Sequence, residues 1–134
     1  MNRPRVLLVE DNKDMVEIYS DLLDEAGEIE ILVAEDVPQA IELMDASPFD
    51  LIICDYNLPK KNGSHVLNHN KETAKAPVIL CTGGFIDEYD DLKDFRQDLK
   101  WFTSFKKPFN PDRFVDCVRH VLSGKDFQSL SSAN

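Results

Sequence analysis

Four short apolar segments of this chain each lead into polar residues that can bind phosphate or a metal ion. The segments are 6–9, 51–54, 78–81 and 102–105, and the residues that follow them are Glu10 and Asp11, Asp55, Thr82, and Lys106 and Lys107. Three carboxylates, a hydroxyl and an ammonium could together bind a metal ion and a phosphoryl group. That chemistry requires a fold that brings together residues spread over about a hundred positions.

The same segments predict the fold. Short apolar runs bounded by polar residues are typical of strands buried on both faces of a parallel sheet. A further strand is predicted at 31–34, and helical spacing of apolar residues predicts helices at about 15–23, 36–44, 63–71, 88–100 and 110–122. Alternating strands and helices indicate an α/β fold, a three-layer doubly wound sandwich around a five-stranded parallel sheet. In such a sheet the carboxyl ends of all strands lie along one edge, where ligands bind.

Length and composition fit one domain of an ordinary globular protein. The chain has 134 residues, 43% of them apolar and 30% charged. We expect a single domain over 1–122, and a mobile polar tail or the start of a linker over 123–134. The net charge of −10 argues against direct contact with nucleic acid. No apolar run approaches the length of a membrane-spanning helix, so we expect no membrane insertion.

The three cysteines favour a cytoplasmic location. They have no zinc-site spacing and leave an odd thiol, which is typical of a reducing compartment. Cys54 and Cys81 fall on strands that we expect to be adjacent. They are either a potential disulfide or, as we favour, two small core side chains.

The carboxylates favour a magnesium site. Mg²⁺ prefers oxygen ligands and accepts a few carboxylates while keeping several waters. Without a cation, two carboxylates about 4 Å apart repel by roughly 4 kcal/mol at an effective dielectric near 20. Lys107 would offset part of this repulsion. Asp55 could then attack phosphorus and form an acyl phosphate, with Lys107 and Thr82 holding phosphoryl oxygens. Asp11 could alternatively be the cap of the first helix.

Four motifs in order carry a family resemblance. They are Val9-Glu10-Asp11-Asn12, Asp55-Tyr56-Asn57-Leu58-Pro59 followed by Gly63, Cys81-Thr82-Gly83, and Lys107-Pro108-Phe109. With these motifs the chain resembles, over about residues 5–122, the receiver domain of two-component response regulators. The resemblance implies a flavodoxin-like sheet with strand order 2-1-3-4-5. It also implies a signalling phosphoacceptor that catalyses only its own phosphorylation and dephosphorylation.

The resemblance also implies a role for each site residue. Asp55 would be the phosphoacceptor and a Mg²⁺ ligand. The remaining expected roles are direct Mg²⁺ binding by Asp11, binding through water by Glu10, a carbonyl ligand from Asn57, phosphoryl sensing by Thr82 and Gly83, phosphoryl pairing by Lys107, and a cis peptide bond before Pro108. The expected partners are a sensor histidine kinase or a histidine phosphotransfer protein, and a downstream protein target.

One position departs from the pattern and keeps a second hypothesis open. Receivers usually carry Tyr or Phe three residues before the lysine, where this chain has Ser104, so the usual aromatic switch is in doubt. A degenerate receiver that acts only as a binding module is therefore one alternative. A phosphohydrolase of the haloacid-dehalogenase type is another. In that family the nucleophile comes first in the chain and a second Asp follows two residues later, where this chain has Asn57.

Overall fold

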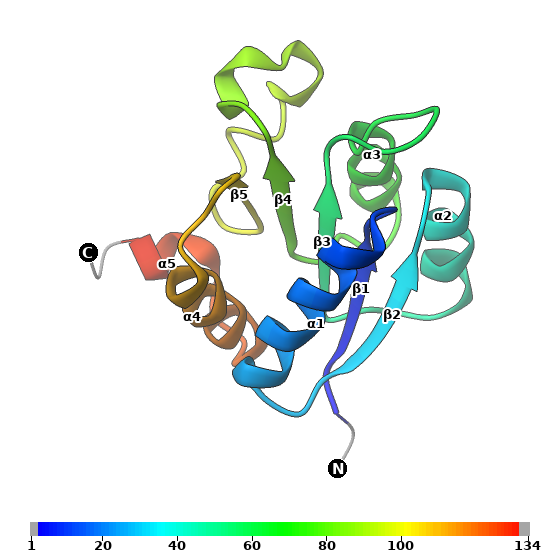
Figure 1. Ribbon diagram of the computed structural model, residues 1–134. Helices are drawn as coiled ribbons and strands as arrows, with labels where there is room; N and C mark the ends of the chain where they lie inside the picture. The colour runs from blue at the N-terminus through cyan, green and yellow to red at the C-terminus, as the bar shows by residue number, and fades with distance from the viewer. Residues whose placement is uncertain (1–2, 132–134) are drawn as a thin grey trace.

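The computed structural model, which describes residues 3–131, contains a five-stranded parallel sheet between two layers of helices (Figure 1). The strands are β1 (Arg5–Val9), β2 (Glu30–Ala34), β3 (Leu51–Asp55), β4 (Val78–Thr82) and β5 (Phe102–Lys106). Their order is β2-β1-β3-β4-β5, and every neighbouring pair is parallel. The predicted fold class and strand order are confirmed.

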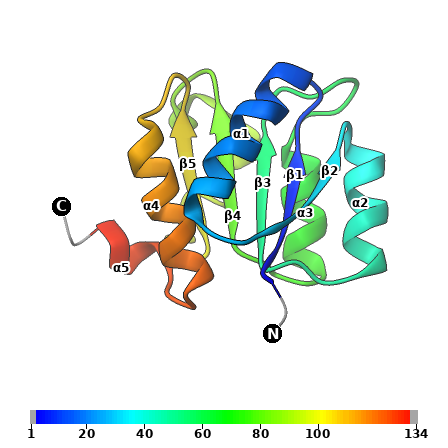
Figure 2. The same cartoon turned by 60° about the horizontal axis from the view of Figure 1, so that its bottom comes forward.

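Helices cover both faces of the sheet. They are α1 (Lys13–Ala26), α2 (Val37–Ala46), α3 (Ser64–Glu72), α4 (Pro111–Leu122) and α5 (Phe127–Ser131). Helices α1 and α4 lie side by side on one face, and α2 and α3 lie on the other (Figure 2). The core is correspondingly split into two apolar clusters, one on each face of the sheet. Within residues 3–131, no helix has the length and apolar character needed to cross a membrane.

Helix α1 is capped by Asn12, so the Asp11 side chain is not needed as a helix cap. The side-chain oxygen of Asn12 accepts hydrogen bonds from the backbone N–H groups of Asp14 and Met15, at 2.9 and 3.1 Å. Asn12, and not Asp11, is therefore the cap of α1. The carboxylate of Asp11 remains exposed at the carboxyl edge of the sheet.

The segment between β4 and β5 is not the helix predicted over 88–100. It contains two 3₁₀ turns, η1 (Ile86–Glu88) and η2 (Asp90–Leu92), followed by further turns up to β5. The prediction of an α-helix is wrong here. The backbone hydrogen bonds of this segment mostly span three residues, as in the 3.1 Å bond from the Leu92 N–H to the Tyr89 carbonyl.

The composition of this segment explains the difference. Asp occurs repeatedly between 87 and 98, and Asp competes with helix formation through local hydrogen bonds to the backbone. Leu92 and Phe95 are buried, as the helical spacing required, but Leu99 remains 56% exposed. Leu92 and Phe95 therefore pack the segment into the core without a regular helix.

The C-terminal tail also differs from its prediction. A mobile polar tail or the start of a linker was expected over 123–134, yet Phe127–Ser131 forms helix α5. Phe127 is 5% exposed and joins the cluster beneath α1 and α4. Its N–H donates to the carbonyl of Lys100 at 2.8 Å. One aromatic side chain thus packs this part of the tail against the domain, and residues 132–134 lie outside the described residues.

The cysteines are core side chains. Cys54 on β3 packs in the cluster facing α2 and α3, whereas Cys81 on β4 packs in the cluster facing α1 and α4. Neighbouring strands therefore place the two thiols on opposite faces of the sheet, where no disulfide can join them. All three cysteines are free and buried.

Candidate functional site

The predicted site residues gather at the carboxyl edge of the sheet. Backbone hydrogen bonds continue the ladders past the strand ends and fix the residues that follow. The Glu10 N–H donates to the Ala34 carbonyl at 2.9 Å, and the Lys107 N–H donates to the Thr82 carbonyl at 2.7 Å. Parallel pairing also sets Asp55 opposite Cys81. The position of each functional side chain is thus set by the sheet.

Asp55 and Lys107 form the centre of the site. Asp55 is only 6% exposed, and the Lys107 ammonium makes an ion pair with its Oδ1. The same ammonium lies 3.8 Å from Oε1 of Glu10, which is 2% exposed. One cation therefore faces two buried carboxylates.

Burial controls the electrostatics of these groups. Burial raises the pKa of the Asp55 carboxyl, against the opposing effect of Lys107. Burial also raises the pKa of Glu10 to about 6. The pKa of Lys107 is raised overall, because its contact with Asp55 outweighs the lowering effect of its own burial. The ammonium therefore stays charged at neutral pH, and burial disfavours the charged form of both carboxyl groups.

The oxygens at this edge fit a magnesium ion. Oε1 of Glu10 is buried with no hydrogen-bond partner among the described residues, so a cation or its bound water would satisfy it. Asp11 and Asn57 are both exposed, Asp11 directly after Glu10 and Asn57 two residues after Asp55. No three Asp, Glu, His or Cys side chains in residues 3–131 are grouped tightly enough to hold a metal by themselves. Mg²⁺ does not need such a group, because it is usually bound by one or two carboxylates plus waters.

Thr82 is the last residue of β4, and its hydroxyl donates a hydrogen bond to the loop that follows. The side chain is buried, and its Oγ1 donates to the carbonyl of Gly84 at 2.5 Å. Gly83 is exposed, and a Cβ there would meet no atom within 4 Å. Ser104 lies on β5 opposite Leu80, partly buried and without an aromatic ring. The pairing of β3 with β4 thus places Thr82 near Asp55, but the Thr82 hydroxyl proton is donated to Gly84.

An aromatic cluster holds the loop that carries Lys107. The rings of Phe105 and Phe109, on either side of the lysine, both pack on Phe114 of α4, with ring centroids 5.5 and 5.0 Å away. The Lys107–Pro108 peptide bond between them is cis. These anchors keep the ammonium directed at Asp55.

Gly63 has a steric role that the motif alone did not explain. Its N–H donates to the Tyr56 carbonyl at 2.7 Å. A Cβ at this position would lie 2.6 Å from the carbonyl oxygen of Asp55. Only glycine lets the start of α3 approach the backbone of the phosphoacceptor candidate so closely.

Sequence reasoning missed a polar network beside Asp55. The Tyr56 hydroxyl donates to the carboxylate of Asp91 at 2.9 Å, and the Asn62 amide donates to both groups at 3.1 Å. The rings of Tyr56 and Tyr89 are in contact, with centroids 4.3 Å apart. Asp91 is 35 residues from Tyr56 and lies in the segment whose structure was wrongly predicted, so no local pattern indicated the contact.

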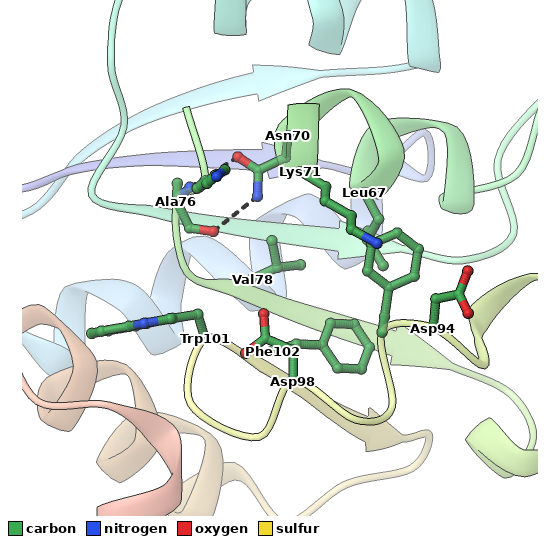
Figure 3. Close-up of a pocket in the computed structure, with 11 residues that line it drawn as sticks. Leu67, Asn70, Lys71, Ala76, Val78, Asp94, Asp98, Trp101 and Phe102 are labelled. Atoms are coloured by element: carbon green, nitrogen blue, oxygen red, sulfur yellow. Dashed lines mark hydrogen bonds between the residues drawn. The ribbon is translucent and has the colours of Figure 1, made fainter. Parts of the chain in front are cut away.

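A cavity of about 340 Å³ lies away from this site (Figure 3). It lies beside Val78 and Phe102, the first residues of β4 and β5, whereas Asp55 and Thr82 are the last residues of their strands. The Asn70 side chain in its wall is occupied by hydrogen bonds to the backbone of Ala76, at 2.9 and 3.0 Å. The cavity is therefore separate from the carboxylate site.

Comparison with known proteins indicates one family. A model described as "Response regulator receiver domain" matches residues 6–119. The transcriptional regulatory protein CpxR of Klebsiella pneumoniae is 35% identical over 120 residues, which are 88% of this chain and 49% of that protein. The sensor histidine kinase TmoS of Ectopseudomonas mendocina is 37% identical over 127 residues, which are 92% of this chain and 12% of the kinase. The chain thus spans about half the length of the CpxR relatives it matches.

Solved structures share the fold. The signal receiver domain of a LuxO repressor protein from Vibrio parahaemolyticus superimposes with a TM-score of 0.78 at 28% identity, covering 98% of this chain and 97% of that one. The chemotaxis protein CheY4 of Vibrio cholerae gives a TM-score of 0.74 at 24% identity, covering 90% and 99% of the two chains.

Proposed function

Because this chain belongs to the response regulator receiver domain family, we propose that it accepts a phosphoryl group on Asp55. The donor would be a sensor histidine kinase or a histidine phosphotransfer protein, and the signal would pass to a downstream protein by direct contact. The observation that supports this most is the buried Asp55 carboxylate at the end of β3, paired through one oxygen with Lys107.

The geometry suggests how the transfer would proceed. Lys107 holds Oδ1 of Asp55, which leaves Oδ2 as the nucleophile. A bond forms between Oδ2 and phosphorus while the bond from phosphorus to the donor histidine nitrogen breaks, and the electron pair leaves with that nitrogen. Lys107 has further N–H donors and can pair with a phosphoryl oxygen as negative charge develops.

Magnesium would complete the site. Asp11, Asp55 and the carbonyl of Asn57 would bind the ion directly, and Glu10 would bind it through water. When bound, Mg²⁺ supplies positive charge to the phosphoryl oxygens in the transition state. The buried Oε1 of Glu10, which lacks a hydrogen-bond partner within residues 3–131, supports this assignment.

Labelling by acetyl phosphate tests the proposal. The wild-type protein with Mg²⁺ should gain one phosphoryl group by mass spectrometry, and Asp55→Asn should gain none while keeping a cooperative unfolding transition. Asp24→Asn, an exposed change on α1, is the matched control and should label like wild type. A phosphoryl group on the Asp55→Asn protein would refute the assignment.

A binding module that works without phosphorylation is the second candidate, because Ser104 removes the usual switching ring. Failure of the wild-type protein to label with acetyl phosphate, or to bind beryllofluoride in the presence of Mg²⁺, would favour this function over the first.

A further inference from the structure

The Thr82 hydroxyl can serve only one acceptor at a time. It carries a single proton, which it donates to the Gly84 carbonyl at 2.5 Å. The inference developed here rests on the proposed function, because a phosphoryl group on Asp55 would be a competing, charged acceptor. Charge-assisted hydrogen bonds are roughly twice as strong as neutral ones, so phosphorylation would take the proton away from Gly84.

Gly84 is in close contact with the segment that follows it. A Cβ on Gly84 would lie 3.0 Å from the Tyr89 hydroxyl and 3.1 Å from the Glu88 carboxylate. Loss of the Thr82 hydrogen bond frees the Gly84 carbonyl to turn. Because the Tyr89 hydroxyl lies this near the Gly84 backbone, a turn of that peptide changes the contact between them.

Tyr89 in turn belongs to the polar network beside the phosphoacceptor. We use the name tyrosine latch for the contacting rings of Tyr56 and Tyr89 together with the hydrogen-bonded side chains of Asn62 and Asp91. Tyr56 directly follows Asp55, and Asp91 lies in η2. The latch therefore joins the phosphoacceptor strand to the segment 83–101, which has replaced the predicted helix.

We infer that Tyr56, Tyr89 and Asp91 are positioning residues that hold the segment 83–101 in the arrangement where Thr82 donates to Gly84. Turning of the Thr82 hydroxyl toward a phosphorylated Asp55 weakens the latch and releases the segment. Tyr89, which lies in the segment between β4 and β5, thus supplies the switching aromatic ring that receivers usually carry at the position of Ser104 on β5.

Variants of the latch test this inference. In wild type, beryllofluoride with Mg²⁺ should shift the backbone amide resonances of residues 83–85 and also of 89–92. In Asp91→Ala and Tyr56→Phe the resonances at 89–92 should already be displaced before the mimic is added, and the mimic should move them less. Because coupling is reciprocal, both variants should bind the mimic about 2- to 10-fold more tightly, the factor corresponding to one hydrogen bond.

The controls separate this inference from the proposed function. Asp90→Ala removes an adjacent exposed charge with no latch contact, and it should bind the mimic like wild type. If wild type labels at Asp55 but 89–92 do not shift, or if the latch variants bind the mimic equally or more weakly, the latch is refuted while the phosphoacceptor role stands. If wild type neither labels nor binds the mimic, both are refuted.

Discussion

Replacing Glu10 by glutamine should stabilise the metal-free protein near neutral pH by about 2 kcal/mol. Glu10 is almost completely buried, and its Oε1 has no hydrogen-bond partner among the described residues. Glutamine keeps the size of the side chain and can still accept the 3.1 Å hydrogen bond from the Asn12 N–H. The substitution therefore removes the buried charge with little other change.

The magnitude follows from the pKa. Burial raises the pKa of Glu10 from 4.5 to about 6, so the folded protein binds this proton more tightly than the unfolded chain. The associated stability is fully present below pH 4.5 and is lost as the pH rises through about 6. At about 1.4 kcal/mol for each pH unit between these values, the loss is about 2 kcal/mol.

Urea unfolding in EDTA at two pH values measures the effect. Near pH 7.5 the midpoint for Glu10→Gln should lie about 1 M above that of wild type, whereas near pH 4 the two proteins should unfold together. Millimolar Mg²⁺ should narrow or reverse the difference near pH 7.5, because a bound cation stabilises the wild-type carboxylate. Equal midpoints in EDTA near pH 7.5, or a difference that persists near pH 4, would show that Glu10 is not a strained buried charge.

Three further outcomes are expected. Asp11→Ala should weaken Mg²⁺ binding roughly tenfold or more, because it removes one carboxylate ligand. It should also slightly raise the stability of the metal-free protein, because it relieves carboxylate repulsion and leaves the Asn12 cap of α1 intact. Clear destabilisation of this variant in EDTA would contradict the prediction. Gly63→Ala should lower the free energy of unfolding by about 1–3 kcal/mol, because its Cβ would clash with the Asp55 carbonyl. Gly83→Ala is the control and should unfold like wild type, because a Cβ there meets open space. Equal thermal unfolding of Gly63→Ala and wild type would contradict the steric argument. Phe127→Ala should cost about 3 kcal/mol in chemical denaturation, and an unchanged midpoint would show that α5 adds nothing to the domain.

The ends of the strands could be predicted because their signal is local. An apolar run that stops at Glu10, Asp55 or Thr82 predicts a buried strand and also identifies the polar residue at the carboxyl end of that strand. The rules of parallel sheets then bring these ends together without further information. Helix caps are equally local: the side chain of Asn110, directly before Pro111, accepts hydrogen bonds from backbone N–H groups in the first turn of α4.

The segment 88–100 and the tail could not be predicted in the same way. Spacing correctly indicated that Leu92 and Phe95 are buried, but it could not show that 3₁₀ turns bury them as well as a helix would. Composition indicated that the tail is polar, yet Phe127 packs in the apolar cluster on the sheet face covered by α1 and α4. Packing against distant residues overrode the local preference in the tail, whereas in the segment 88–100 the repeated Asp residues weaken the helix that the apolar spacing predicts.

The sequence by itself determined the strands of the parallel sheet and the set of groups at its carboxyl edge, because the burial of apolar runs is a local pattern, whereas the strand order was implied by the family resemblance. Only the tertiary structure decided how those groups use their protons and charges. The hydrogen bond from Thr82 to Gly84, the lack of a partner for Glu10 and the contact of Tyr56 with Asp91 each depend on ångström-scale distances between segments far apart in the chain. Such distances are set by the packing of the whole domain, which no local pattern encodes.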